Sequence, residues 1–327
     1  MKNLIIVVIL TILSFSCSKP ADQNTTTITT PNYFLPPPTT YNYKTINGVK
    51  LFYREAGNKD KPTIVLLHGY PSSSHSYRNL IPMLATHYHV IAPDNLGSGY
   101  SDHLDPDTTT YTFDLLANYT GQLLESLDIE HYIMYMQDFG APVGYRLMMN
   151  NPQQVDALIV QNANAYLEGL TPNRQDFFRT AQTDTTQEKY NFLYTITGED
   201  AIINSQYLFD LDSTNIRFQS PDAWTHDLAF LKSEKDRKIQ VELFQDYNTN
   251  LIRYPQWQKM LRETQPKTLI TWGKKDEKFN ANGARAYLQD LPNAELHLID
   301  AGHFAAEEKT REIAELILKF LNKNNLY

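Results

Sequence analysis

Short apolar runs alternate with amphipathic stretches through much of the chain. The runs are rich in aliphatic and β-branched residues, which is typical of strands buried on both faces. Four of them lie in the first half: Thr63–Leu67, His89–Pro93, His131–Met136 and Ala157–Gln161. Helical spacing of apolar residues follows over Asp114–Leu127 and Ala141–Asn150. Strands that alternate with helices imply right-handed crossovers, so the pattern predicts an α/β fold with a mostly parallel sheet flanked by helices.

The ends of this repeat add further predicted elements. A hairpin with its turn at Asn47-Gly48 precedes the first buried run, and the strand pattern resumes near the end of the chain before a closing amphipathic helix. The segments are Tyr41–Lys44, Val49–Arg54, Lys267–Trp272, Ala294–Ile299 and the helix Ile313–Leu321. Both late strands therefore belong to the same sheet as the early ones.

Residues 164–255 interrupt the strand pattern. They contain no buried-strand run and are rich in helical spacing and aromatic residues. We interpret them as a helical cap inserted into one core formed by residues 41–163 and 256–327. A cap above the strand ends would enclose an apolar pocket with little water, although most of its aromatic residues are expected to form its own core.

The first forty residues have another character. A basic start and the apolar run Leu4–Leu13, which is too short to span a bilayer, predict a signal peptide over residues 1–17. Ser16-Cys17 resembles a bacterial lipoprotein cleavage site, which implies a lipid on Cys17 and anchoring to a cell-envelope membrane on its periplasmic or surface side. Secretion with an incidental Cys17 is the alternative. The Thr- and Pro-rich residues 18–40 predict a disordered tether.

Composition excludes several classes of function. The net charge of −8 is opposite to the basic surface of a nucleic-acid-binding protein. A single cysteine excludes an intrachain disulfide, an iron–sulfur cluster and a cysteine-based zinc site. Histidines and carboxylates form no cluster with ligand spacing, so neither a metal nor a cofactor is expected.

Glycines mark the expected site. The chain has only 13, and more than half lie at or just beyond predicted strand ends or in the following helix. These are Gly69, Gly97, Gly99, Gly140, Gly144, Gly273 and Gly302. Glycine permits tight turns and close approach of the backbone to a ligand, and ligands of parallel sheets bind at the carboxyl ends of the strands. We therefore place the site at this edge.

Five motifs at this edge resemble the α/β-hydrolase fold, and more narrowly its epoxide hydrolase and haloalkane dehalogenase branch. They are His68-Gly69-Tyr70-Pro71, Asp94–Asp102, Gln137-Asp138-Phe139-Gly140, Trp272–Asp276 and Gly302-His303-Phe304. Each motif alone is weak, but the five occur in the expected order, each after its own strand. The resemblance covers about Tyr41 to Leu321.

Asp138 stands where serine members of the fold carry the nucleophile, and no serine has the G-x-S-x-G context. An aspartate is ionised at neutral pH and can attack a saturated carbon without a general base, leaving an ester that water can hydrolyse. His303 follows the last strand, where it could activate that water, and Asp276 could orient it. Glu277 and Asp300 compete with Asp276 for this role.

The resemblance assigns the remaining parts of the site. The backbone N–H groups of Tyr70 and Phe139 match the oxyanion hole of the family. His68, Gly69 and Pro71 are expected to shape the loop that carries Tyr70. Met136 departs from the family pattern, because a small residue is usual at that position.

The leaving group decides the substrate class. Dehalogenases hold the halide with a Trp after the nucleophile and a second Trp or Asn, whereas Phe139 and Tyr70 occupy two of these places. Epoxide hydrolases protonate the alkoxide with two cap tyrosines. Tyr194 and Tyr247 are the candidates, with Tyr190 and Tyr166 behind them, and Trp224 is a partial substitute for a halide donor.

We therefore predict a hydrolase that opens small apolar epoxides with water. Carbon–halogen hydrolysis by the same chemistry is the alternative within the class. A binding protein that holds an apolar ligand without turnover is the alternative of another class. Its pocket would not require Asp138, His303 and Asp276 together.

Overall fold

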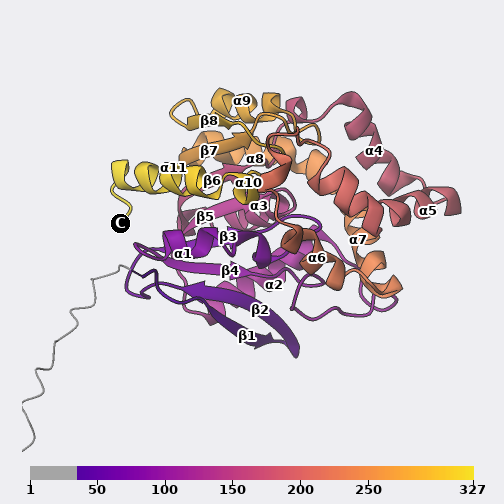
Figure 1. Ribbon diagram of the computed structural model, residues 1–327, viewed down its shortest axis with the longest axis horizontal. Helices are drawn as coiled ribbons and strands as arrows, with labels where there is room; N and C mark the ends of the chain where they lie inside the picture. Colours follow the sequence, from indigo (N-terminus) through magenta and orange to yellow (C-terminus); the bar gives the residue numbers. More distant parts are fainter. Residues whose placement is uncertain (1–34) are drawn as a thin grey trace, which may run out of the picture. The chain divides into compact units, whose positions relative to one another are not determined.

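A computed structural model describes residues 35–327, so the predicted signal peptide, Cys17 and most of the tether lie outside the described residues. An eight-stranded sheet with the order β1-β2-β4-β3-β5-β6-β7-β8 forms its centre (Figure 1). The strands are β1 Thr40–Ile46, β2 Val49–Ala56, β3 Thr63–Leu67, β4 His89–Pro93, β5 Tyr132–Gln137, β6 Val155–Gln161, β7 Lys267–Gly273 and β8 Glu295–Ile299. The hairpin β1–β2 pairs antiparallel to β4, and the pairs from β4 to β8 are parallel. The predicted α/β fold is confirmed.

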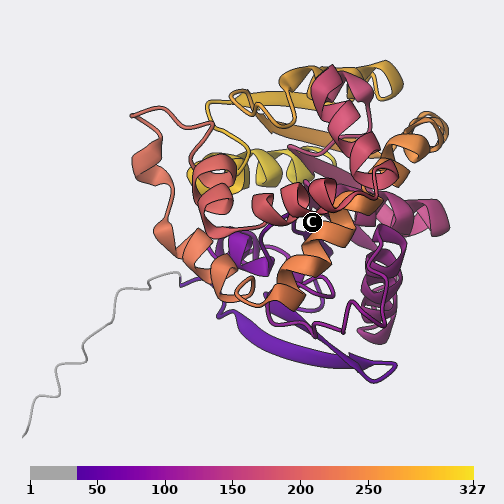
Figure 2. The same ribbon diagram turned by 90° about the vertical axis from the view of Figure 1, so that its right-hand side faces the viewer.

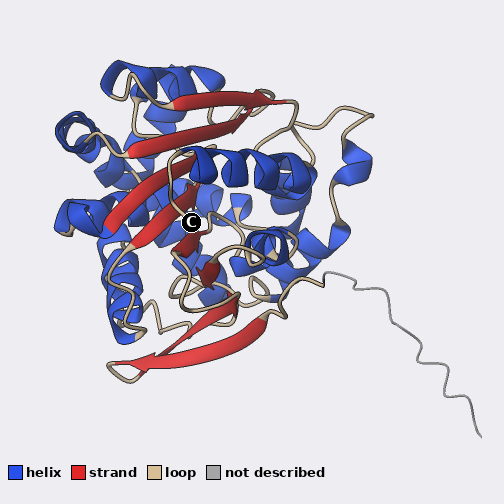
Figure 3. Cartoon of the chain, turned by 90° about the vertical axis from the view of Figure 1, so that its left-hand side faces the viewer, coloured by secondary structure: helices blue, strands red, loops and turns tan. Residues whose placement is uncertain are grey.

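Helices cover both faces of the sheet (Figure 3). Alternate side chains of each central strand point to opposite faces, so Ile64 and Leu66 join one hydrophobic cluster and Val65 and Leu67 the other. Helices α1 (Leu80–Leu84) and α11 (Thr310–Lys323) pack on the first face. The second face carries α2 (Phe113–Ser126), α3 (Gly140–Asn150), α8 (Asn248–Thr264) and α9 (Ala281–Asp290). Each continuous apolar strand is thus buried on both sides.

The segment between β6 and β7 is helical throughout its regular structure. It contains α4 Pro172–Thr183, α5 Gln187–Ile196, the π-helix η4 Ala201–Tyr207, α6 Pro221–Ala229 and α7 Glu234–Asp246, together with the short turns η3 Leu167–Gly169 and η5 Ile216–Phe218. These helices lie together on the right of Figure 1, and Figure 2 shows them in front of the sheet. We refer to residues 164–255 as the cap. Its proposed end at residue 255 falls inside α8.

Three further short elements lie at the strand ends and on the sheet edge: η1 Ser74–Tyr77, η2 Pro152–Gln154 and α10 Ala305–Glu308. No helix of residues 35–327 combines the length and the apolar composition that a membrane crossing requires.

Candidate active site

Asp138 lies in the sharp turn between β5 and α3. Its backbone is left-handed, with φ of 48°, a conformation that costs an ordinary side chain about 1–3 kcal/mol. The turn requires close neighbours without side chains. A Cβ on Gly69 would lie 2.4 Å from Asp138 Cβ, and one on Gly140 would lie 2.3 Å from the carbonyl oxygen of Leu67. The two glycines therefore allow the strained turn to pack against the loop after β3.

The loop after β3 holds one oxygen of the Asp138 carboxylate. The backbone N–H of Tyr70 donates to Asp138 Oδ1 over 2.7 Å. Phe139 is the N-cap residue of α3, at a helix end whose first N–H groups have no partner within the helix. The Tyr70 N–H thus contacts the carboxylate directly, the Phe139 N–H lies at the start of the adjoining helix, and Asp138 Oδ2 accepts no backbone N–H.

His68 ties this loop to the next strand. Asn95 N–H donates to His68 Nε2 over 2.9 Å, and His68 Nδ1 lies 3.0 Å from the carbonyl oxygen of Gly69. Burial lowers the pKa of His68, which favours the neutral ring with its proton on Nδ1. Pro71 follows Tyr70 through a cis peptide bond in the same loop. His68, Gly69 and Pro71 thus all lie in the loop that carries Tyr70.

His303 lies between two carboxylates. Its Nδ1 is 2.7 Å from Asp276 Oδ2, and its Nε2 is 3.6 Å from Asp138 Oδ2. All three residues are buried. The competing carboxylates point elsewhere: Glu277 is exposed, and Asp300 forms surface ion pairs with the lysines that precede Asp276. The structure brings Asp138, His303 and Asp276 together in the order that the sequence predicts.

Opposing influences act on the His303 ring. Burial lowers its pKa, but the charges of Asp276 and Asp138 outweigh burial and raise the pKa to about 9. Gln137 acts in the other direction, because its Nε2 lies 3.3 Å from His303 Nε2 while its Oε1 accepts from the Gly69 N–H. The Gln137 amide is thereby oriented as a donor and favours an unprotonated Nε2. If Asp138 lost its charge, nothing on that side would oppose Gln137, and the basic form of His303 would be favoured.

Asn162 and Gln137 were not predicted from the sequence. Asn162 Nδ2 donates to Asp276 Oδ2 over 2.7 Å, and its Oδ1 accepts from the Gly273 N–H over 2.9 Å. Asn162 thus fixes the carboxylate that orients His303. Both residues end or follow strands at the edge that the glycines mark, and this position was the available signal.

Two cap tyrosines lie near the nucleophile. The Tyr247 ring is 5.4 Å from the ring of Phe139 and stacks on Phe178. Burial raises the pKa of Tyr247 and of Tyr254, and the charge of Asp138 raises both further. Within residues 35–327, the buried Tyr254 hydroxyl has no hydrogen-bond partner. Both hydroxyls therefore remain protonated at neutral pH, as an acid for an alkoxide requires.

The structure corrects the prediction for Tyr194. On α5, Phe192 and Ile196 line a hollow in the cap. Tyr194 packs instead against Arg237, whose guanidinium carbon lies 3.6 Å from the centre of the Tyr194 ring. Tyr190 stacks on Tyr194 on this same α5–α7 face. No contact of Tyr194 with Asp138 occurs in the described part of the chain. The direction of α5 is set by its packing on α7, which sequence spacing did not reveal.

Tyr254, like Tyr247, lies near enough to Asp138 for the charge of that carboxylate to raise its pKa. Tyr247 and Tyr254 are seven residues apart, about two helical turns, so they lie on one side of α8. This spacing could have found the pair. The reserve candidate Tyr166 donates its hydroxyl to Asp290 and is thus engaged elsewhere.

The three tryptophans of the chain serve packing. Trp224 packs against Tyr207, Trp257 stacks on Tyr145, and the indole N–H of Trp272 donates to the Phe279 carbonyl. None of these contacts involves Asp138. The expectation that Trp224 substitutes for a halide donor gains no support.

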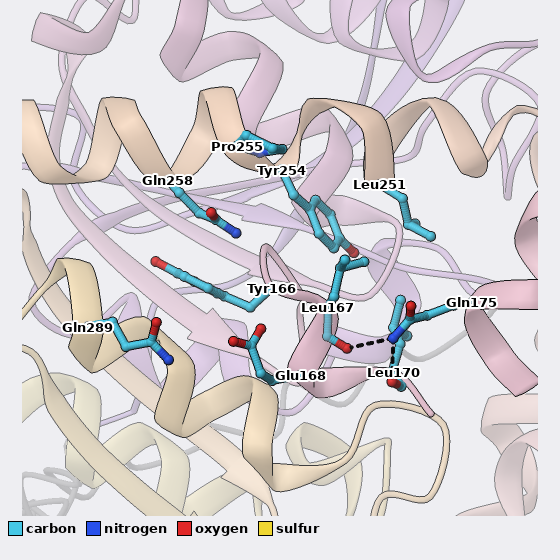
Figure 4. A pocket seen from close by; sticks show the side chains of 10 residues that line it. All are labelled: Tyr166, Leu167, Glu168, Leu170, Gln175, Leu251, Tyr254, Pro255, Gln258 and Gln289. Atoms are coloured by element: carbon cyan, nitrogen blue, oxygen red, sulfur yellow. Dashed lines mark hydrogen bonds between the residues drawn. The ribbon is translucent and has the colours of Figure 1, made fainter. Parts of the chain in front are cut away.

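Two hollows adjoin the cap. One, of about 370 Å³, lies among α4, α5, α7 and the loop after β7. The other, of about 530 Å³, lies between η3, α4 and α8, and Tyr254 projects into it from α8 (Figure 4). Gln175 closes part of its floor through hydrogen bonds to the carbonyls of Leu167 and Leu170 (Figure 4). Asp138 and His303 line neither hollow, so the reacting groups lie deeper.

No group of three or more histidine, cysteine or carboxylate side chains within residues 35–327 is arranged to hold a metal ion.

Comparison with known proteins gives a consistent family. The sequence profile described as alpha/beta hydrolase fold matches residues 62–310. An uncharacterized hydrolase of Saccharomyces cerevisiae, YNR064C, is 38% identical over 282 residues, which cover 85% of this chain and 95% of the yeast protein.

Two more distant relatives are named for two different activities. A haloalkane dehalogenase of Psychrobacter cryohalolentis is 26% identical over 84% of this chain and 88% of its own. Epoxide hydrolase 1 of Caenorhabditis elegans is 25% identical over 86% of this chain and 70% of its own. The crystal structure of a putative ancestral haloalkane dehalogenase superposes with a TM-score of 0.72 at 20% identity, covering 86% of this chain and 98% of that one.

Proposed function

Because this chain belongs to the α/β-hydrolase fold family, we propose that it opens epoxides to diols through an ester on Asp138. The observation that carries the proposal is the position of Asp138. Its Oδ1 is held by the Tyr70 N–H, and its Oδ2 lies beside His303. A nucleophile needs one free oxygen and a base for the second step, and both are present.

In the first step Asp138 Oδ2 attacks an epoxide carbon. The C–O bond of the ring breaks, and the oxygen that leaves takes the proton of Tyr254 or Tyr247. A general acid in this position contributes about 10²–10⁴-fold to a rate. The product of the step is an ester between Asp138 and the opened substrate.

In the second step His303 Nε2 removes a proton from water, and the hydroxide adds to the carboxyl carbon of Asp138. The negative charge that develops on Oδ1 meets the N–H groups of Tyr70 and Phe139. Collapse releases the diol and restores the carboxylate. The proton on His303 returns through solvent to the tyrosine that gave one up.

The choice of epoxide over halide rests on the donors near Asp138. Two tyrosine hydroxyls lie near it, whereas the three indoles make their contacts elsewhere. An alkoxide requires a proton, while a halide requires only donor dipoles. Dehalogenation remains the second candidate, because a dehalogenase is among the relatives.

Product analysis tests the proposal. Purified protein is incubated with styrene oxide and, separately, with 1-bromobutane, and diol and bromide are measured. We expect diol formation to exceed bromide release, and we expect Asp138→Ala to abolish it. Faster bromide release would reverse the order of the two candidates. Ligand binding without turnover of either compound would favour the binding-protein alternative.

The proposal includes a lipid-anchored location, supported by the apolar run before Cys17. Radiolabelled palmitate should label the protein in growing bacterial cells, and Cys17→Ser should remain unlabelled. Release of unlabelled wild-type protein into the medium would instead indicate secretion.

A further inference from the structure

Arg174, whose guanidinium has no hydrogen-bond or ion-pair partner among residues 35–327, faces the smaller hollow of the cap. Arg174 lines this hollow together with the apolar side chains of Phe177, Phe192, Ile196 and Phe244. It lies in the first turn of α4, where Thr171 Oγ1 accepts from its backbone N–H. The capping contact satisfies one N–H of the first turn of α4 and so stabilises the start of the helix that carries Arg174.

The hollow is separated from the residues beside Asp138 by one side chain, Phe244. Phe244 forms its inner side, and the Phe244 ring lies 4.8 Å from the ring of Tyr70 and 5.6 Å from that of Phe139. These are the two residues whose backbone N–H groups flank Asp138. On the other side, Lys278 follows Asp276 by two residues and donates its backbone N–H to Asp276 Oδ1.

Two cations line the hollow, and within residues 35–327 only Lys278 has an ion-pair partner. Lys278 Nζ pairs with Asp210 Oδ2 at 3.4 Å, and the exposed Glu277 makes no ion pair with Arg174. The Arg174 guanidinium lies over the rings of Phe177 and Phe178, at 5.6 and 6.0 Å from their centres. In residues 35–327 no acceptor is hydrogen-bonded to this guanidinium.

The environment of Arg174 favours an added anion. Burial lowers the pKa of Arg174, and the carboxylates of Asp276 and Asp138 act against this effect. An arginine stays charged in proteins and presents a planar fork that matches a carboxylate in two parallel hydrogen bonds. A half-buried cation over aromatic rings is stabilised when such a partner arrives.

We propose that Arg174 binds a carboxylate of the substrate, so that the substrates are epoxides bearing a carboxylate group. This inference rests on the proposed function and specifies its substrate class. The single unpaired guanidinium matches one singly charged planar group. The apolar walls hold the carbon skeleton, and the epoxide lies toward Asp138.

A different role would be general charge balance. Arg174 could offset the charges of Asp138, Asp276 and Asp210 without touching a substrate. Charge balance would affect neutral and anionic epoxides alike, whereas recognition affects only the anionic ones. The ratio between two matched substrates therefore separates the roles.

The test uses three epoxy acids of increasing length, each compared with its primary amide. They are oxirane-2-carboxylate, 3,4-epoxybutanoate and 4-(oxiran-2-yl)benzoate. We expect wild type to prefer at least one acid over its amide by about 10- to 100-fold in kcat/KM, the range of a charge-assisted hydrogen bond. Arg174→Met should bring that ratio to about one or below, and Arg174→Lys should lie between.

Arg179→Met is the matched control, because Arg179 lies exposed on the same helix and pairs with Asp176. It should keep the wild-type ratio. A wild-type ratio of one or less for all three acids would overturn the inference. So would an equal loss on acid and amide in Arg174→Met.

Calorimetric binding of 4-(1,2-dihydroxyethyl)benzoate separates this inference from the proposed function, because it needs no turnover. Wild type should bind this diol acid at least 10-fold more tightly than Arg174→Met does, and Arg174→Lys guards against misfolding of the methionine variant. Equal binding by all three proteins would contradict the inference. Failure to open any epoxide, with Arg174-dependent binding intact, would refute the proposed function alone.

Discussion

The sheet edge and the cap differ in how far their polar side chains are hydrogen-bonded. At the edge, the side chains of Asp138, Asp276 and His303 are fixed by neighbouring backbone and side-chain groups. In the cap, the hydroxyl of Tyr254 and the guanidinium of Arg174 have no hydrogen-bond partner within residues 35–327. The three side chains at the edge thus have hydrogen-bond partners without a substrate, whereas the two cap groups have none within residues 35–327.

This difference separates chemistry from selectivity. A buried polar group without a partner costs about 1–3 kcal/mol, and a substrate that supplies the partner recovers this free energy on binding. Groups that are already satisfied gain little from the ground state of a substrate and can act on the transition state. We therefore attribute the reaction type to the edge and the choice of substrate to the cap.

The largest effect is expected at the edge. Asp138→Ala removes the atom that forms the ester, so kcat should fall by at least about 10⁴-fold, as for other covalent nucleophiles. Diol formation from styrene oxide measures it. The control is Asp300→Ala, which removes a carboxylate directly after β8 whose partners are surface lysines. If both variants lose activity equally, Asp138 has no special role.

His303→Gln should separate the two steps. It removes the base for water but leaves Asp138 free to attack, so turnover should fall by about 10³-fold while the ester accumulates. Intact-protein mass spectrometry should show one added epoxide mass per chain. A variant that is inactive and carries no adduct would place His303 in the first step.

The division also explains what the sequence could predict. Buried strands such as Thr63–Leu67 were found because an unbroken apolar run has few other uses in a soluble core. Asp138, His303 and Asp276 were found because each follows its own strand, and parallel strands bring their ends to one edge.

The same reasoning predicted fewer features of the cap. A helix face is chosen by what it packs on, so Tyr194 turned toward Arg237 while Tyr254 reached the site. Arg174 was not predicted, since a charge in a helical segment is usually solvated. Its isolation depends on side chains from α5, α7 and the loop after β7.

Variants of the cap tyrosines test the difference between the sheet edge and the cap. Tyr254→Phe and Tyr247→Phe each remove one acid, and we expect the better acid to cost about 10²-fold in kcat/KM on epoxides. The double variant should cost more, and bromide release from 1-bromobutane should change less than epoxide opening. Tyr194→Phe is the control and should match wild type. A larger loss of kcat/KM in Tyr194→Phe than in the other two variants would mean that Tyr194 on α5 is the acid.

A smaller effect is expected for Gln137→Met. It removes the amide that donates toward His303 Nε2 and accepts from Gly69. Loss of hydrogen bonds of about 1 kcal/mol predicts a fall in kcat of about 10-fold or less. The pH at which ester hydrolysis reaches half its maximum should rise, because the basic form of His303 is less favoured. A fall in kcat with an unchanged pH profile would mean a purely structural role.

The last effect concerns stability rather than catalysis. The pKa of His303 is raised to about 9 in the folded protein, above the usual 6.5. This contribution is therefore complete below about pH 6.5 and is lost as the pH rises to 9, on the order of 1 kcal/mol per unit. Urea unfolding at pH 6 and pH 9.5 should show a larger loss for wild type than for His303→Gln. Equal losses would mean that His303 is not charged in the free protein.

The central claim is that the new oxygen of the diol comes first from Asp138. A single turnover of an epoxide in water enriched in oxygen-18, with enzyme in excess, tests it directly by mass spectrometry of the diol and of the peptide that contains Asp138. We predict an unlabelled diol and one oxygen-18 atom in the Asp138 carboxylate. A labelled diol with an unlabelled Asp138 would show that water attacks the substrate directly, and would contradict the account.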